Sequence, residues 1–576
     1  MKKKLILSAC ILLFILVLGC KDTNVNPALN KGNNSAISEN INLLKEFNNF
    51  KSKLKQSSSI ESKEEEIDKM IAKIGRGNFP LIQNNNVIII YRLEEGENIT
   101  FISDLSNWKE QKMNRLADTS LYYLLLQVPK KARFEYKFIV DGKFINDPLN
   151  NNKVKSKVFE FNSQVIMPEY KSRKYWIEDT RFAKGKIINK KIDEINLSIY
   201  LPPKYSQDSR NSVLYFIGGN QYLEYAKINN TLDKLNDQNS LNTIGVFIDS
   251  KELASLSKEG IDLEYFLSHQ IIPYIDNNYN TIADAKGRTL VAFNEYANLA
   301  ASIVLKKPNL ISNLILQSPV LSDEILLLLE NNNSKDIKNS KDIKVYLDWG
   351  EFNKKQGINN NLEFLRRLEE KGYEYKAQIN LEANNWSSWR ENIIDGLEYI
   401  LLDKGNFNNL KKMIIKEEFD GQYSNLFTEI NNENLRIKKL SGEYELNFRE
   451  TTFLKLSYYK FREFDLQLDL KLINSKPIAL FLTGRENYTV VINPAKKDLS
   501  IFENEEQKIY QNKINNISQI DSLRLFAKGN KLNLFINEQE IGKIDFATDN
   551  SKYISLMGVK DSKIKIGGIY IEEILN

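Results

Sequence analysis

The sequence contains a single histidine, His269, among its 576 residues. A Ser-His-acid triad needs an imidazole that titrates near neutral pH, and zinc sites of the common kind need several histidine ligands. His269 lies in a segment with helical spacing shortly before Pro273, which we expect to flank a sheet, away from the strand ends where sites form. We therefore predict a packing or surface role for His269, and neither a metal site nor a cofactor.

Cysteine is nearly as scarce, because Cys10 and Cys20 are the two cysteines and both precede residue 21. The rest of the chain therefore has no disulfide framework. The net charge is only +5, and no basic stripe with interleaved aromatic residues stands out, which argues against nucleic-acid binding. Beyond residue 18 no apolar run is long enough to predict a membrane-spanning helix.

Residues 1–20 have the pattern of a targeting segment, with a basic start followed by a short apolar run. The segment ends in Val17-Leu18-Gly19-Cys20, which resembles a bacterial lipoprotein lipobox. The resemblance implies that Cys20 is diacylated and holds the protein on a membrane surface, inner or outer, of a bacterial cell envelope. An ordinary signal peptide with a chance cysteine is the alternative.

The length predicts three to four domains. Residues 21–36 are polar and Asn-rich and predict a flexible tether, and residues 37–78 predict a helical lead-in with apolar residues at helical spacing. Three globular parts follow: an all-β part over 79–165, an alternating α/β part over 175–405 and a β-rich part over 420–576.

The part over 79–165 shows alternating strands and a hairpin turn at Asp141-Gly142. It resembles the early-set immunoglobulin-like domain of the glycogen-binding and isoamylase N-terminal type, and the N-terminal domain of enterochelin-esterase-like proteins. The second likeness rests on Phe79-Pro80-Leu81-Ile82, Met113-Asn114-Arg115-Leu116, Arg133-Phe134-Glu135-Tyr136-Lys137-Phe138 and Asp147-Pro148-Leu149-Asn150. The first likeness implies sugar contact at Trp108, Lys137 and Phe144, whereas the second implies an accessory lid over the next domain, with Trp108 packed against its own sheet.

The part over 175–405 contains short apolar runs that predict a mostly parallel sheet. Its motifs resemble the esterase D and enterochelin esterase family, which implies an α/β-hydrolase fold. They are Tyr200-Leu201-Pro202-Pro203, Val246-Phe247-Ile248-Asp249, Ile271-Ile272-Pro273-Tyr274-Ile275-Asp276 and Tyr346-Leu347-Asp348-Trp349-Gly350.

At the catalytic positions of that family, this sequence has other residue types. The nucleophile elbow, usually G-x-S-x-G, reads Ala292-Phe293-Asn294-Glu295-Tyr296, so Asn294 occupies the serine position. The histidine position within Ala383-Asn384-Asn385-Trp386-Ser387-Ser388-Trp389-Arg390 holds Asn384. An amide is neither a general base nor an ordinary nucleophile, so we predict that acyl transfer by a triad is lost.

The sequence leaves two possibilities for the space around the elbow: an open remnant pocket lined by Trp386 and Trp389, or one plugged by Phe293 and Tyr296. Gly218-Gly219 keep the backbone of an oxyanion loop, Glu295 adjoins the nucleophile position, and Trp386 and Trp389 remain from the histidine segment. The acid of the triad falls after Gly350, where Glu351 and Asn353 are both candidates.

The part over 420–576 has strands at the spacing of a β-sandwich. Residues 528–537 and 567–571 resemble the hairpin and closing strand of concanavalin-like jelly rolls, which often bind glycans. Their E-x-D-x-x-E carboxylate motif is absent, and Glu503, Glu505 and Glu506 are interpreted as a solvated turn.

These observations predict a multidomain fold with an early-set β-sandwich, a degenerate α/β-hydrolase domain and a jelly-roll-like sandwich. The predicted function is a lipid-anchored, non-catalytic binding or scaffold protein, with a glycan as the leading ligand class. Two alternatives stay open: a carbohydrate-active hydrolase or esterase using carboxylates such as Glu295 and Glu351, and a structural surface protein that binds another envelope protein.

Overall fold

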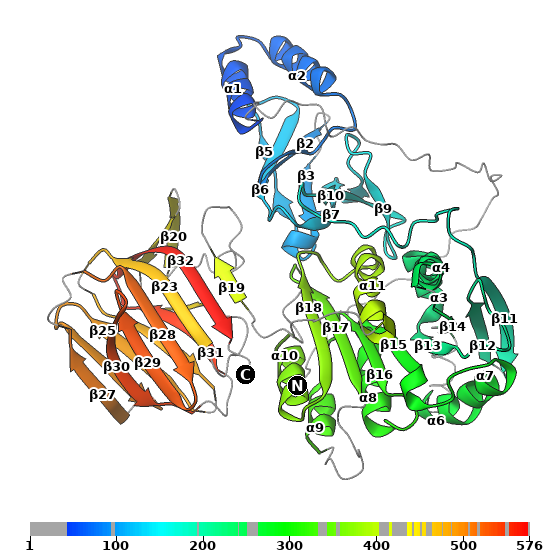
Figure 1. Cartoon of the computed structure of the whole chain (residues 1–576). Helices are drawn as coiled ribbons and strands as arrows, with labels where there is room; N and C mark the ends of the chain where they lie inside the picture. Colours follow the sequence, from blue (N-terminus) through cyan, green and yellow to red (C-terminus); the bar gives the residue numbers. More distant parts are fainter. Residues whose placement is uncertain are drawn as a thin grey trace, which may run out of the picture. The chain divides into compact units, whose positions relative to one another are not determined.

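The structure is a computed structural model of the whole chain (Figure 1). It describes residues 43–573 apart from 94–97, 193–194, 240, 250, 252–262, 332–342, 353–357, 403–413, 418–434, 441–442, 450–451, 457–463, 475, 485, 505–506, 515–518 and 548–551. The targeting segment, Cys20, the tether and the start of the lead-in therefore lie outside the described residues. Within those ranges, no helix combines the length and apolar character needed to cross a bilayer.

Two helices open the described chain, α1 (Leu43–Gln56) and α2 (Ile60–Ile74). The Ser59 side chain accepts a hydrogen bond from the Ser62 backbone N–H and caps the start of α2, and Gly75, with a φ of 87°, ends it. Phe47, Leu54 and Ile67 are buried in one cluster with residues of the following β-domain. The helical lead-in thus packs on that domain.

The β-domain consists of two antiparallel sheets, in the orders β1-β2-β6-β5 and β4-β3-β7-β10-β9, with β8 paired to β7. Their apolar inner faces share a core that includes Phe101, Phe134 and Phe138. Asp141 and Gly142 both have positive φ angles, 45° and 76°, and form the two-residue turn between β7 and β8. The strands are β1 (Leu81–Gln83), β2 (Asn86–Arg92), β3 (Ile99–Ser103), β4 (Gln111–Lys112), β5 (Asn114–Arg115), β6 (Leu121–Gln127), β7 (Arg133–Val140), β8 (Lys143–Ile145), β9 (Lys153–Lys155) and β10 (Phe161–Ile166).

The α/β part is built on one eight-stranded sheet in the order β11-β12-β14-β13-β15-β16-β17-β18. The strands from β13 to β18 are parallel, whereas β12 is antiparallel to β14. The bounds are β11 (Lys186–Ile192), β12 (Ile195–Leu201), β13 (Ser212–Ile217), β14 (Thr243–Ile248), β15 (Arg288–Phe293), β16 (Asn313–Gln317), β17 (Lys344–Gly350) and β18 (Glu374–Asn380). The predicted parallel sheet is therefore present, with two further strands, β11 and β18, at its edges.

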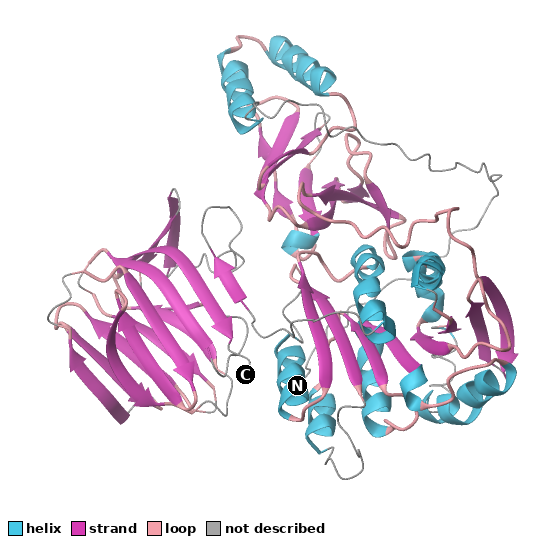
Figure 2. Cartoon of the chain, in the orientation of Figure 1, coloured by secondary structure: helices cyan, strands magenta, loops and turns pink. Residues whose placement is uncertain are grey.

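Helices lie on both faces of this sheet (Figure 2). Two separate apolar clusters show which helices cover which face: one contains buried residues of α6 to α10, the other of α4 and α11. The helices are α3 (Gly219–Gln221), α4 (Ile228–Asn239), α6 (Leu263–Phe266), α7 (Ile272–Asn278), α8 (Ala297–Lys306), α9 (Asp323–Asn331), α10 (Ile358–Glu370) and α11 (Trp386–Leu402).

The C-terminal part is rich in sheet, as predicted. One sheet has the order β20-β21-β32-β23-β28-β29-β30, with β19 paired to β32, and the other has the order β22-β31-β24-β25-β26-β27. Buried residues of both sheets form one shared core. The strands are β19 (Ile414–Glu417), β20 (Leu435–Leu440), β21 (Glu443–Phe448), β22 (Thr452–Lys455), β23 (Phe464–Leu472), β24 (Ile478–Thr483), β25 (Tyr488–Asn493), β26 (Asp498–Glu503), β27 (Gln507–Lys513), β28 (Ser522–Lys528), β29 (Lys531–Ile536), β30 (Gln539–Asp545), β31 (Tyr553–Gly558) and β32 (Lys563–Glu573).

Candidate functional site

The elbow position keeps the backbone shape of a strand-to-helix turn. Strand β15 ends at Phe293, Asn294 has a φ of 37°, and α8 begins at Ala297. A positive φ is uncommon for residues other than glycine, although asparagine tolerates it better than most. The Asn294 Nδ2 donates a hydrogen bond of 2.8 Å to Glu295 Oε2. The turn therefore presents an amide, held by its neighbour, where the hydrolase elbow presents a hydroxyl.

The space beside the elbow is filled by aromatic rings. The Phe293 ring centroid lies 4.7 Å from that of Trp386 and 5.0 Å from that of Trp389, and both tryptophans are buried. A Cβ added to Gly218 would lie 2.9 Å from ring atoms of Phe293 and Tyr296. Of the two arrangements that the sequence left open, an open cleft or one filled by Phe293 and Tyr296, the ring contacts match the second, because Phe293 packs against both tryptophans.

Asn384 occupies the position of the family's catalytic histidine, and its side-chain amide accepts a hydrogen bond. The Asn384 Oδ1 accepts a hydrogen bond of 2.6 Å from the Gly350 backbone N–H, at the end of β17. A Cβ on Gly350 would lie 2.3 Å from the Glu382 carbonyl oxygen, so the loop approaches this strand end closely. Asn384 thus serves as a link between loop and sheet.

Sequence reasoning did not single out Asp348, a buried carboxyl on β17 one residue before Trp349. The Tyr346 hydroxyl lies 3.2 Å from Asp348 Oδ2. Burial, with the nearby Asp395 charge, raises the pKa of Asp348 to about 7. Of the two acid candidates after Gly350, Glu351 is exposed and Asn353 lies outside the described residues.

His269 lies beside a serine, with its Nδ1 2.8 Å from the Ser268 hydroxyl oxygen. The Ser268 hydroxyl also lies 2.8 Å from the Glu264 carbonyl oxygen, and His269 Nδ1 lies 3.0 Å from the Tyr265 carbonyl oxygen. His269 is exposed and stacks on the Tyr265 ring at 4.2 Å. Since backbone carbonyls of the preceding helical turn also contact both side chains, the pair is engaged within its own exposed helical stretch and does not face the elbow.

A buried polar network joins the β-domain to the loop that carries Asn384. Arg133 of β7 donates from Nη2 to Glu382 Oε2 at 2.9 Å and to Ser388 Oγ at 2.8 Å. The Ser387 hydroxyl donates to Glu135 Oε1 at 2.5 Å. The Arg133 and Glu382 side chains are only 3% and 4% exposed, so their charges are almost fully withdrawn from water.

Asp104 belongs to the same network. Its Oδ2 accepts from the Glu135 backbone N–H at 2.7 Å, and its Oδ1 accepts from Trp108 Nε1 at 3.0 Å. Burial, reinforced by the Glu135 charge, raises the pKa of Asp104 to about 8. A carboxyl that holds a proton near neutral pH therefore lies between Trp108 and the interface.

The three residues predicted to contact sugar come together around Phe159, which sequence reasoning missed. The Phe159 ring lies 6.2 Å from Trp108 and 4.8 Å from Phe144, and the Lys137 ammonium lies 5.2 Å from its centroid. The Phe144 side chain is 51% exposed. Lys137 also donates to Asn146 Oδ1 at 2.7 Å. We call Trp108, Phe144 and Phe159 the aromatic row.

The segment around β9 brings two lysines to the elbow side of the hydrolase part. Lys157 lies 3.9 Å from Glu295, and Lys155 lies 2.9 Å from Glu224. Glu295 is 46% exposed in its side chain and is bonded to both Lys157 and Asn294. In the part of the chain that the structure describes, no group of three His, Cys, Asp or Glu side chains could hold a metal ion.

Comparison with known proteins identifies similar sequences for the α/β part. A family model described as "Putative esterase" matches residues 189–400. The chain is 26% identical over 225 residues to the "Uncharacterized protein YjcH" of Bacillus subtilis (strain 168), which covers 36% of this chain and 92% of that protein. Residues 189–400 are thus esterase-like and of the α/β-hydrolase type.

Two solved structures are also similar. The enterobactin esterase from Shigella flexneri aligns with a TM-score of 0.46 and 14% identity, over 55% of this chain and 93% of that one. The ferric enterobactin esterase from Salmonella typhimurium aligns with a TM-score of 0.45 and 14% identity, over 56% and 95% of the two chains.

Proposed function

We propose that this chain is a lipid-anchored protein of a bacterial cell envelope, in which an esterase-like domain binds or organises other molecules without hydrolysing them. The observation that carries the proposal is the pair of amides at the two reactive positions. Asn294 occupies the elbow with its strained backbone, and Asn384 is bonded to Gly350. Neither amide can supply the hydroxyl or the proton acceptor of acyl transfer. Anchoring at Cys20 rests on the lipobox resemblance.

The rival function is hydrolysis by carboxylates. Glu295 is partly exposed at the elbow, and Glu351 is exposed at the end of β17. Against this reading, the Glu295 carboxylate is already engaged, by the Lys157 ammonium at 3.9 Å and by the Asn294 amide at 2.8 Å. We therefore rank non-catalytic binding first.

The first prediction concerns turnover. The purified chain is expected to hydrolyse p-nitrophenyl esters and glycosides no faster than buffer, because amides occupy the nucleophile and histidine positions and the Ser268–His269 pair lies on an exposed helical stretch. The double variant Asn294→Ser, Asn384→His is expected to stay inactive, because the Phe293 and Trp386 rings fill the space beside the elbow.

The matched comparison is Glu295→Gln, assayed with the same substrates. Turnover by the wild type that disappears in Glu295→Gln would establish the carboxylate mechanism and end the non-catalytic proposal. Turnover that appears only in the double variant would show that the pocket is open to substrate, while leaving the wild type non-catalytic.

The aromatic row supports a glycan as the bound molecule. Three rings with an adjoining ammonium and amide offer flat apolar surface beside polar groups, which suits the faces and hydroxyls of a sugar. Asp104 accepts from the Trp108 Nε1 and fixes the orientation of that ring.

The second prediction follows from Phe159, which contacts both other rings of the row. We expect maltoheptaose to bind with measurable heat in calorimetry, and Phe159→Ala to weaken binding about 10-fold, as loss of about 1.4 kcal/mol of aromatic contact implies. Tyr265→Ala removes an exposed ring elsewhere and should leave affinity unchanged. Absence of binding, together with a cross-link to another envelope protein, would favour the structural-protein alternative.

A further inference from the structure

Trp108, a member of the aromatic row, has a backbone conformation that bulky residues rarely adopt. Its φ is 60° and the φ of the preceding Asn107 is 51°, so two consecutive residues lie in the left-handed region. For a large side chain this conformation is strained, and it persists only where the surrounding structure holds it. The position of the Trp108 ring therefore depends on the contacts around it.

Two hydrogen bonds hold Trp108 in this conformation. Its backbone N–H donates to the Ser103 carbonyl oxygen at 2.8 Å, across the 3₁₀ turn Asp104–Ser106. Its indole Nε1 donates to Asp104 Oδ1 at 3.0 Å, and the Asp104 side chain is buried. The first bond is local, whereas the second makes the orientation of the ring depend on where the Asp104 carboxyl is held.

The Asp104 carboxyl is held from two sides. Its Oδ2 accepts from the Glu135 backbone N–H of β7 at 2.7 Å and from Asn385 Nδ2 at 3.3 Å. Asn385 lies in the loop between β18 and α11, next to Asn384. A side chain of the α/β part therefore bonds to the carboxyl that orients the Trp108 ring.

Ser387, near the start of α11, provides a second connection through Glu135. The Ser387 hydroxyl donates to Glu135 Oε1 at 2.5 Å, and Asn162 Nδ2 donates to Glu135 Oε2 at 2.8 Å. The Glu135 side chain is buried, so its carboxylate is fixed by these partners. Ser387 thus helps to fix the residue whose backbone N–H donates to Asp104.

We propose that the α/β part positions the Trp108 ring for sugar binding and that it acts through Asp104. Asn385 and Ser387 are positioning residues, because they reach the indole only through other groups of the network. A ring that is fixed before the ligand arrives loses less freedom on binding, which raises affinity. The inference rests on the proposed sugar binding at the aromatic row, and it gives the α/β part a role that needs no catalysis.

The position of the ring can be measured without a ligand, by fluorine NMR of the full chain labelled with fluorotryptophan. The chain has five tryptophans, and Trp108→Phe identifies the signal of Trp108. We expect this signal to shift in Asp104→Ala and in the double variant Asn385→Ala, Ser387→Ala. The signal of Trp349, which is buried in the hydrolase sheet, reports whether each variant is folded.

Calorimetric titration with maltoheptaose measures the effect of these variants on binding. Asp104→Ala is expected to weaken binding about 10-fold, because the indole loses its charged hydrogen-bond partner. The double variant is expected to weaken binding at least about 3-fold, the usual size of an effect that is passed on through neighbouring groups.

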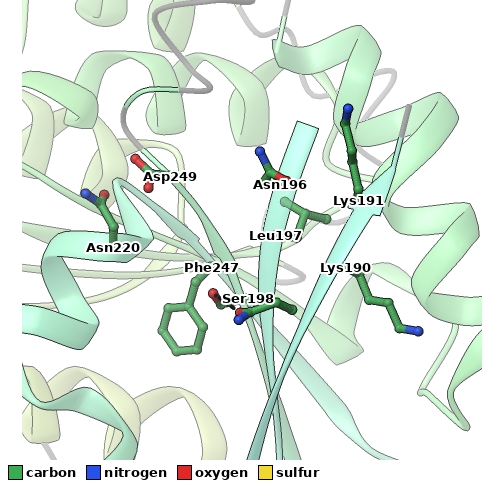
Figure 3. A pocket seen from close by; sticks show the side chains of 9 residues that line it. Lys190, Lys191, Asn196, Leu197, Ser198, Asn220, Phe247 and Asp249 are labelled. Carbon is green, nitrogen blue, oxygen red and sulfur yellow. Dashed lines mark hydrogen bonds between the residues drawn. The ribbon is translucent and has the colours of Figure 1, made fainter. Parts of the chain in front are cut away.

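A pocket at the opposite edge of the hydrolase sheet supplies the matched control (Figure 3). Its volume is about 440 Å³, and Asn189 of the edge strand β11 is among its lining residues. The Ser198 hydroxyl donates to Asn189 Oδ1 at 2.9 Å. Asn189→Ala therefore removes one amide hydrogen bond of the α/β part, as Asn385→Ala does, and should change neither the Trp108 signal nor the affinity.

An unchanged Trp108 signal in the folded double variant would overturn the inference, and so would a shifted signal with unchanged affinity. Equal weakening by Asn189→Ala would also overturn it, because the effect would then not be specific to the loop that contains Asn385. If maltoheptaose does not bind the wild type, the glycan part of the proposed function fails, and the signals alone decide whether the α/β part holds the ring. Hydrolysis by the wild type, which the ester and glycoside assays detect, would leave both readouts unaffected.

Discussion

Arg133→Ala is expected to lower the free energy of unfolding by about 3–5 kcal/mol, the usual cost of removing one partner from a buried ion pair. The Arg133 side chain is 3% exposed and bonds to Glu382 and Ser388. Without it, the Glu382 carboxylate would stay in the same buried place with no countercharge, and burying an unpaired charge is strongly unfavourable.

Urea unfolding followed by tryptophan fluorescence measures this effect. Arg181→Ala is the control, because the Arg181 side chain is 81% exposed in its pair with Asp179 and such pairs contribute about 0–1 kcal/mol. Arg133→Met combined with Glu382→Leu should recover much of the loss, since it removes both charges together. A loss below about 1 kcal/mol in Arg133→Ala would mean that water enters the network and solvates Glu382.

The strands of the hydrolase sheet could be predicted from the sequence in part. The parallel core of the sheet was predictable, because β13 to β17 are continuous apolar runs buried on both faces. The edge strands β11 and β18 were not predicted, because Lys186–Ile192 and Glu374–Asn380 are about half polar and show little apolar pattern. Strands at a sheet edge need less apolar surface than strands at its centre.

The site was predictable only where a motif position identified it. Asn294 and Asn384 follow from aligning two short motifs, and the structure places both at strand or loop ends of the hydrolase sheet. The bond from Arg133 to Glu382 joins residues 249 positions apart, and no periodicity encodes it. Phe159 was missed for a similar reason, because a lone aromatic residue in a turn predicts nothing until its neighbours are known.

The tryptophans show a question that the sequence could pose but not answer. Trp386 and Trp389 could either line an open cleft or be covered by Phe293 and Tyr296, and both arrangements fit the motif. The Phe293 ring packs against both indoles, beside the elbow. Phe293, next to the nucleophile position, buries the two tryptophans, and this packing can be seen only in the structure.

The protein is also expected to lose stability as the pH rises from 5 to 8, opposite to the usual behaviour of acidic groups. Asp104 and Asp348 are buried, and their pKa values are raised to about 8 and about 7. Above pH 4 the unfolded chain has released these protons, because an ordinary aspartate has a pKa of about 3.9, whereas the folded chain still holds them. The native state therefore binds more protons, and the free energy of unfolding falls by up to about 1.4 kcal/mol per pH unit for each group until its folded pKa is passed.

Urea unfolding at pH 5, 6, 7 and 8 measures that fall, which we expect to total on the order of 3 kcal/mol or more. The range from pH 5 to 8 suits this test, because histidine is the side chain that ordinarily titrates there and the chain has only one, His269, which is exposed. Asp104→Asn and Asp348→Asn should each flatten the profile, since an amide resembles the protonated carboxyl at every pH. Asp179→Asn should keep the wild-type slope, because hydrogen bonds from Arg181 lower the pKa of Asp179 and it stays charged throughout the window. A wild-type profile that is level or rises with pH would mean that both carboxyls are charged in the folded protein, with Arg133 compensating Asp104 more strongly than burial opposes it.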